Sequence, residues 1–158
     1  MIDDTDRKHL QRCVDLASEA LDRGNEPFGS VLASSEGEVL FEDYNRIGGG
    51  DHTQHPEFAI ARWAANNMDV QDRAKATVYT SGEHCPMCAA AHGWVGLGRI
   101  VYASSAAQMT AWLSELGVPA FRVRPLPIRD VISDTPVDGP VEEFARQVRA
   151  LHVRSHIR

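Results

Sequence analysis

Two of the chain's three cysteines stand three positions apart in the stretch SGEHCPMC, at Cys85 and Cys88. Upstream, the stretch HPE places His55 two residues before Glu57. Thiolates and a neutral imidazole are ligands that zinc prefers, and three protein ligands leave the fourth tetrahedral position open. An open position is typical of catalytic zinc, because a structural zinc is closed by four protein ligands. The pattern therefore predicts a catalytic zinc site made by His55, Cys85 and Cys88.

Glu57 supplies the group that hydrolysis at such a site needs beside the metal. It lies two residues from His55, near enough to reach a water on the zinc without binding the zinc itself. Zinc lowers the pKa of a bound water from about 15.7 to roughly 7. A carboxylate can accept the proton of that water and deliver it to a leaving group. We therefore expect Glu57 to be the catalytic acid and base of a hydrolytic deamination.

The cysteine pair by itself permits two other interpretations. Thioredoxin-like redox dithiols use the same Cys-x-x-Cys spacing, although they need neither the upstream histidine nor the acid. A purely structural zinc would need a fourth ligand, for which His84 and His92 are the candidates. Adjacent ligands at positions 84 and 85 would bind one ion with poor geometry. The objection is weaker for His92, which lies about one helical turn after Cys88.

The periodicity of the sequence predicts the elements that bring these motifs together. Apolar residues three or four apart predict helices over residues 5–23, 56–67, 86–97, 106–117 and 140–154. Short apolar runs predict strands over 29–35, 38–45, 75–81 and 99–105, with one more near 128–133. His55 and Cys85 each precede a predicted helix, so two helix N-termini, whose partial charge favours thiolates, can converge on one sheet edge.

The alternation of hairpin, helix and strand predicts one α/β domain over residues 1–158, a three-layer α/β/α sandwich. A composition of 43% hydrophobic and 24% charged residues is typical of a globular protein. The net charge of -6 gives no general attraction to nucleic-acid phosphates, so a nucleic-acid partner is not expected.

No apolar run is long enough to cross a bilayer, and the N-terminus lacks the apolar run of a signal peptide. We therefore expect a cytoplasmic protein without a membrane partner. Cys13 falls on the apolar face of the first predicted helix and is expected in the core. The remaining histidines outside the motifs are expected at the surface, namely His9, His52, His152 and His156.

The motifs resemble those of the zinc-dependent cytidine-deaminase superfamily. HPE, a gap of 27 residues and CPMC are similar to the H-x-E…P-C-x-x-C signature of these deaminases. EPFGSVLA resembles the PFGAV strand start of bacterial guanine deaminases and related nucleobase deaminases. SGEHCPMCAAAHGW resembles their S/T-x-E-P-C-x-M-C helix, and YNR resembles the strand end that carries a base-binding asparagine. The resemblance covers most of the chain from about Pro27 to Tyr102.

This resemblance implies a mixed five-stranded sheet flanked by helices, and a homodimer. It also implies that Asn45 holds the substrate ring and that Phe28 and Trp94 line the substrate pocket. Glu115 is the nearest match to an additional acid that guanine deaminases carry in their C-terminal region. His84 stands at the pocket edge, where relatives have proline. We therefore expect Asn45, Phe28, Trp94, His84 and Glu115 to bind substrate.

Pro56 departs from the resemblance, because relatives have a small residue between the histidine and the glutamate. Proline has no N–H, so any hydrogen bond that relatives donate to the base from this position is lost. His92 also replaces a residue that is commonly apolar. These departures affect the choice of substrate rather than the chemistry.

The motifs together predict a zinc-dependent aminohydrolase that acts on a free nucleobase. The base is expected to be guanine-like or cytosine-like, or a related amino-substituted heterocycle such as an s-triazine. One alternative is tRNA adenosine deaminase, which needs a basic surface for the anticodon arm; the acidic chain has no cluster of Lys and Arg beside the motifs. The other alternative is a non-enzymatic, zinc-stabilised interaction module.

Overall fold

The sheet is the centre of the computed structural model, which describes residues 1–157. Its strands lie in the order β2-β1-β3-β4-β5. β1 is antiparallel to both of its neighbours, whereas β3, β4 and β5 run parallel. The mixed five-stranded sheet is therefore confirmed. The strands span Gly29–Ala33 (β1), Val39–Tyr44 (β2), Thr77–Gly82 (β3), Ile100–Ser104 (β4) and Val137–Asp138 (β5).

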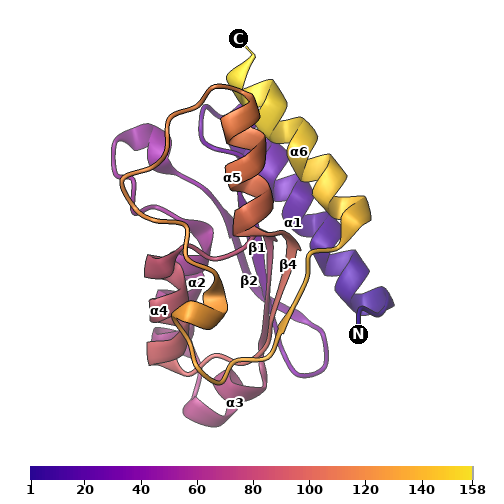
Figure 1. Cartoon of the computed structure of the whole chain (residues 1–158). Helices are drawn as coiled ribbons and strands as arrows, with labels where there is room; N and C mark the ends of the chain where they lie inside the picture. Colours follow the sequence, from indigo (N-terminus) through magenta and orange to yellow (C-terminus); the bar gives the residue numbers. More distant parts are fainter. Residues whose placement is uncertain (158) are drawn as a thin grey trace.

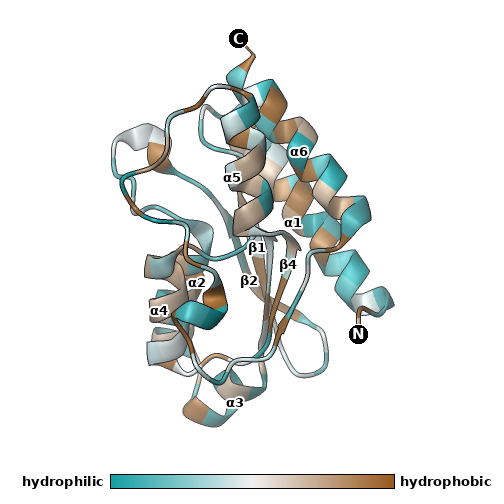
Figure 2. Cartoon of the chain, viewed as in Figure 1, coloured by the Kyte–Doolittle hydropathy of each residue, from teal (hydrophilic) through white to brown (hydrophobic). Residues whose placement is uncertain are grey.

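Helices cover both faces of the sheet. Figure 1 shows α1 and α6 side by side on one face, and α2 and α4 together on the other. The three-layer α/β/α architecture is therefore confirmed. Figure 2 shows hydrophobic and hydrophilic residues alternating along α6, as expected for a helix with one face on the sheet. The helices span Asp4–Asp22 (α1), Pro56–Asn67 (α2), Val70–Lys75 (α3), Pro86–Val95 (α4), Ala106–Glu115 (α5) and Glu142–His156 (α6).

The central strands are buried on both sides, and successive residues face opposite layers. Val31 of β1 and Tyr79 of β3 pack in the cluster formed with α1 and α6. Leu32, which follows Val31, and Val78, which precedes Tyr79, pack in the cluster formed with α2. Burial is therefore nearly continuous along β1 and β3 rather than alternating. It also means that polar residues in these strands lie against a helix layer.

The segment between α5 and α6 differs from the prediction. The expected strand near residues 128–133 is wrong, because this stretch begins with a 3₁₀ helix at Ile128–Asp130. Ile128 is 1% exposed and packs on Ile100, and Val131 and Ile132 pack against the same cluster. The spacing of these three residues is not the alternation of a strand. The strand that pairs with β4 is Val137–Asp138.

The short helix α3 was also not predicted. It has six residues, none of them buried, and is capped by the side chain of Asp69. A helix that buries no residue has no apolar stripe by which its sequence could be recognised.

Two histidines expected at the surface are buried. His9 and His152 are each 3% exposed, which contradicts the prediction. His9 lies on the face of α1 that packs on the sheet, and its ring lies against Tyr79. His152 lies on α6 between the rings of Phe28 and Trp112. His52 and His156 are exposed and Cys13 is fully buried, as predicted. None of the helices in residues 1–157 combines the length and apolar character needed to cross a bilayer.

Candidate metal centre

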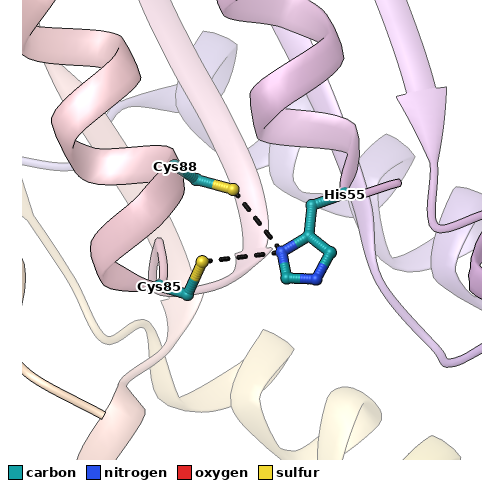
Figure 3. Close-up of side chains that lie close together, drawn as sticks. All are labelled: His55, Cys85 and Cys88. Atoms are coloured by element: carbon teal, nitrogen blue, oxygen red, sulfur yellow. Dashed lines mark hydrogen bonds between the residues drawn. The ribbon is translucent and has the colours of Figure 1, made fainter. Parts of the chain in front are cut away.

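Three predicted ligands meet at the N-termini of two neighbouring helices. Nδ1 of His55 lies 3.5 Å from Sγ of Cys85 and 3.5 Å from Sγ of Cys88 (Figure 3). The three ligand atoms all lie within 4.8 Å of one another. Within residues 1–157, no other histidine, cysteine or acid belongs to this cluster. The structure therefore brings together the ligand set that the motifs predict.

The starts of α2 and α4 place these side chains. His55 and Cys85 are the N-cap residues of the two helices, and each is followed by proline in the first turn. Proline suits this position because the first N–H groups of a helix have no partner within the helix. Cys88 follows one turn into α4 and is fully buried. Two helix N-termini, each with partial positive charge, thus converge on two thiols and favour their ionised forms.

The donor set fits zinc. Zn–S bonds of about 2.3 Å and Zn–N bonds of about 2.0–2.1 Å at tetrahedral angles place sulfur and nitrogen roughly 3.5 Å apart. Both sulfur–nitrogen separations in the cluster are 3.5 Å. One imidazole and two thiols are also the ligand types that zinc prefers. With three protein ligands, the fourth position of the ion is left for water or substrate.

The three side chains of the cluster differ in how readily they lose their protons. Hydrogen bonds from Cys88 and His55 lower the pKa of the Cys85 thiol to about 4. The same hydrogen bond with Cys85 raises the pKa of His55 to about 9. The neighbouring thiolate conversely raises the pKa of Cys88. A divalent cation would release the remaining protons, because metal ligands bind in their deprotonated forms.

Glu57 lies in the first turn of α2, beside the cluster but outside the ligand set. Its side chain is 6% exposed. Oε1 accepts hydrogen bonds from Thr80 Oγ1 at 2.6 Å and from Ser30 Oγ at 3.1 Å. Burial raises the pKa of Glu57, whereas the hydrogen bond from Thr80 and the charge of His55 oppose this shift. A buried carboxyl that is not a ligand is suited to proton transfer.

Asn45 and Phe28 lie at the adjoining ends of β2 and β1. The N–H of Asn45 donates to the carbonyl of Phe28 at 2.9 Å. Asn45 is 2% exposed, and its Oδ1 accepts from the N–H of Ile47 at 3.1 Å. Asn45 therefore shapes a turn, while its Nδ2 takes part in none of the side-chain hydrogen bonds described for residues 1–157. The ring of Phe28 lies over Gly82, at the end of β3, where an added Cβ would be 3.2 Å from the ring.

The structure does not bring Trp94 to the cluster. Its side chain is 90% exposed on α4, where it borders a shallow groove with Ala61 and Ala65 of α2. Glu115 is likewise placed elsewhere, at the end of α5. Its carboxylate accepts from the guanidinium of Arg149 on α6 at 3.0 Å. Within this chain, neither side chain has the surroundings expected of a substrate-binding residue.

His84 and His92 lie close to each other rather than in the ligand cluster. Each is 1% exposed, and their ring centroids are 5.5 Å apart in an edge-to-face arrangement. Burial lowers the pKa of both imidazoles. Nε2 of His92 is 2.7 Å from the carbonyl oxygen of Gly98. Neither ring is a fourth ligand here, which argues against the closed structural zinc site considered from the sequence.

Sequence reasoning missed three polar residues around the site. Ser30 and Thr80 are 0% exposed and bond to its carboxylate. Their signal in the sequence is a hydroxyl two residues away from an apolar residue of the same strand, on the face shared with Leu32 and Val78. Burial raises the pKa of Glu26, and the charges of His55 and two other histidines oppose this shift. Glu26 therefore places a second acid within electrostatic reach of the cluster.

Comparison with protein families gives an independent result. The family described as "Cytidine and deoxycytidylate deaminase zinc-binding region" matches residues 3–104. This range contains His55, Glu57, Cys85 and Cys88, so the match includes the whole cluster.

Curated relatives with different substrates in their names are similar to this chain. A probable cytosine deaminase of Schizosaccharomyces pombe is 31% identical over 105 residues, 66% of this chain and 63% of that protein. The guanine deaminase of Bacillus subtilis is 33% identical over 97 residues, 60% of this chain and 62% of that protein. A tRNA-specific adenosine deaminase of Haemophilus influenzae is 31% identical over 101 residues, 63% of this chain and 58% of that protein. The matches thus span less than two thirds of the length of these relatives.

The fold has close solved counterparts. A crystal structure of a mutant protein in complex with 8-azaguanine superposes with a TM-score of 0.72 at 17% sequence identity. The superposition covers 96% of this chain and 84% of that chain. At this level of identity, the similarity establishes the fold. It does not identify the substrate, which has to be argued from the residues of the site.

Proposed function

Because the chain belongs to the cytidine and deoxycytidylate deaminase zinc-binding family, we propose that it hydrolytically deaminates a free nucleobase and releases ammonia. The base is guanine-like or cytosine-like, or a related amino-substituted heterocycle such as an s-triazine. The observation that carries the proposal is the buried, unligated Glu57 beside the cluster of His55, Cys85 and Cys88. A redox dithiol or a structural zinc would have no use for this acid.

Each residue of the site has a separate role in the proposed reaction. His55, Cys85 and Cys88 would hold a zinc ion, and its Lewis acidity would make water a nucleophile near neutral pH. Glu57 accepts a proton from the attacking water, delivers it to a ring nitrogen and then protonates the departing amine. Water and the amino-substituted base thereby give the oxo-substituted base and ammonia. Nδ2 of Asn45 is the donor available to a ring acceptor, and the ring of Phe28 provides an apolar wall.

Two relatives and the net charge of the chain support a free base rather than a large partner. The relatives include a probable cytosine deaminase and a guanine deaminase, both named for small bases. The net charge of -6 disfavours the phosphate backbone of an RNA. A homodimer is part of the proposal, and light scattering of the zinc-loaded protein would test it.

The first prediction concerns the substrate class. The zinc-loaded chain should release ammonia from at least one member of a panel of guanine, cytosine, isoguanine and amino-s-triazines. Ammonia release and mass spectrometry of the product would measure this directly, with Glu57→Gln as the matched control. If the wild-type protein and Glu57→Gln are equally inactive on every base while both hold zinc, the proposal fails and a zinc-stabilised interaction module is favoured.

Deamination of adenosine in tRNA is the second candidate, favoured by the relative from Haemophilus influenzae. A gel shift with tRNA at low and moderate salt separates the two functions, because binding through phosphates weakens steeply with salt. Tight, salt-dependent binding together with inosine formation in the tRNA would overturn the free-base proposal. Absence of a shift, together with turnover of a free base, would support it.

A further inference from the structure

Two hydroxyls buried in the sheet, those of Ser30 and Thr80, have no part in the zinc motifs. Both side chains are 0% exposed. They share the face of the sheet on which the apolar Leu32 and Val78 pack against α2. A hydroxyl in such surroundings is destabilising unless it is hydrogen-bonded, so its partners indicate its role.

Both hydroxyls meet at one oxygen of Glu57. Oε1 of Glu57 lies 2.6 Å from Thr80 Oγ1 and 3.1 Å from Ser30 Oγ. The two hydroxyls are also 2.9 Å from each other. Ser30 and Thr80 are direct partners in the β1–β3 pairing, so the register of the sheet fixes their separation. The other oxygen, Oε2, takes part in none of the side-chain hydrogen bonds described for residues 1–157.

We propose that Ser30 and Thr80 are positioning residues that hold Oε1 of Glu57 and leave Oε2 as the oxygen that exchanges protons. This inference rests on the proposed function, because it assumes that Glu57 transfers protons during deamination. A carboxylate on a side chain with several rotatable bonds needs such support, since a displacement of about 1 Å can lower a rate about 10²-fold.

The hydroxyl of Thr80 can support Glu57 in both of its forms. It has one proton and two acceptors within reach, Oε1 of Glu57 at 2.6 Å and the carbonyl oxygen of Gly82 at 3.0 Å. Toward the carboxylate, Thr80 donates. Toward the carboxylic acid protonated at Oε2, Thr80 continues to donate to Oε1, because the carbonyl oxygen of a carboxylic acid remains an acceptor. Glu57 therefore keeps a hydrogen bond throughout the proton transfers of one turnover.

The test removes the hydroxyls while keeping the shape of the side chains. Thr80→Val replaces a hydroxyl by a methyl group, Ser30→Ala deletes the other hydroxyl, and Thr80→Ser restores one. We expect the double variant Ser30→Ala with Thr80→Val to lose about 10²-fold in kcat. KM should stay within about twofold, because the lost hydroxyls do not contribute to binding of the substrate in its ground state. Zinc content should be unchanged, because neither residue is a zinc ligand. Thr80→Ser should recover most of the rate that Thr80→Val loses.

Ser104→Ala is the matched control. Its hydroxyl is equally buried and donates to the carbonyl of Ser81 at 2.7 Å, but does not contact Glu57. This variant should keep the wild-type kcat even if it is less stable. An equal loss of kcat in Ser104→Ala and in Thr80→Val would show that the effect is structural, and would overturn the inference.

A crystal structure of the zinc-loaded double variant provides a readout independent of activity. The carboxylate of Glu57 should leave the position that it occupies beside residues 30 and 80. An unmoved carboxylate, or a double variant with the wild-type kcat, would overturn the inference. If the wild-type protein deaminates no base, the proposed function fails, and the position of the carboxylate alone decides whether the hydroxyls hold it.

Discussion

Glu57 and the three ligand side chains share one site but differ in what stabilises their charges. Within the cluster of His55, Cys85 and Cys88, internal hydrogen bonds lower the pKa of Cys85 to about 4 and raise the pKa of Cys88. Glu57 instead depends on hydroxyls from the sheet and on the charge of His55, against a burial that raises its pKa. Cys85 is thus ready to bind a cation, whereas Cys88 would release its proton on binding one. The part of Glu57 in proton transfer stays a prediction.

A prediction at this scale separates the acid from the ligands. Glu57→Gln should keep its zinc yet lose about 10²–10⁴-fold in rate, the usual contribution of general acid–base catalysis. Cys85→Ala should lose zinc and activity together, because one of three ligands is gone. Elemental analysis and ammonia release measure both properties. Cys13→Ala is the matched control, since Cys13 lies in the core, and it should retain zinc. Full activity in Glu57→Gln would remove Glu57 from the mechanism.

At the scale of elements, the site depends on how closely α1 lies against β1. Gly29, the first residue of β1, has no room for a side chain. A Cβ there would lie 2.5 Å from the carbonyl oxygen of Cys13 and 2.5 Å from Cβ of Leu16, both on α1. Glycine at this position lets the helix approach the strand that carries Ser30. The packing of α1 on one face of the sheet thus sets the position of Ser30, whose side chain lies on the opposite face.

The prediction at this scale concerns stability. Gly29→Ala should lower the free energy of unfolding by about 1–3 kcal/mol, the usual effect of overpacking a core. Urea denaturation of the zinc-free protein would measure it. Gly49→Ala is the matched control because no atom lies within 4 Å of an added Cβ there, and it should change stability by at most about 0.5 kcal/mol. Equal stability of the two variants would show that α1 can move away from β1 without loss.

At the scale of the whole molecule, buried histidines couple stability to acid. Burial lowers the pKa of His92 to about 4 and of His152 to about 4, from an ordinary value of 6.5. Between these values the unfolded chain binds more protons than the folded chain, so stability rises with pH. This stability is present above about pH 6.5 and is lost as the pH falls toward 4. We therefore expect the fold to weaken in mild acid even without zinc.

His152→Phe tests this coupling, because a phenyl ring can pack between Phe28 and Trp112 without binding a proton. Between pH 7 and pH 5, the wild-type protein should lose about 2 kcal/mol more of its unfolding free energy than the variant. Urea denaturation with a chelator keeps zinc release out of the measurement. His52→Asn, at an exposed position, should follow the wild-type protein. A variant with the wild-type pH dependence would contradict the assignment.

The motifs and the periodicity of the sequence determined the metal-binding cluster, the three-layer architecture and most element boundaries. They also singled out Glu57, whose catalytic role stays a prediction. These features are local, because a helix start, an apolar period or a ligand spacing is written in neighbouring residues. Only the tertiary structure decided the surroundings of side chains far apart in sequence. It exposed Trp94, paired Glu115 with Arg149 and buried His152. It also set Ser30 opposite Thr80, because strand register and layer packing decide which distant residues meet.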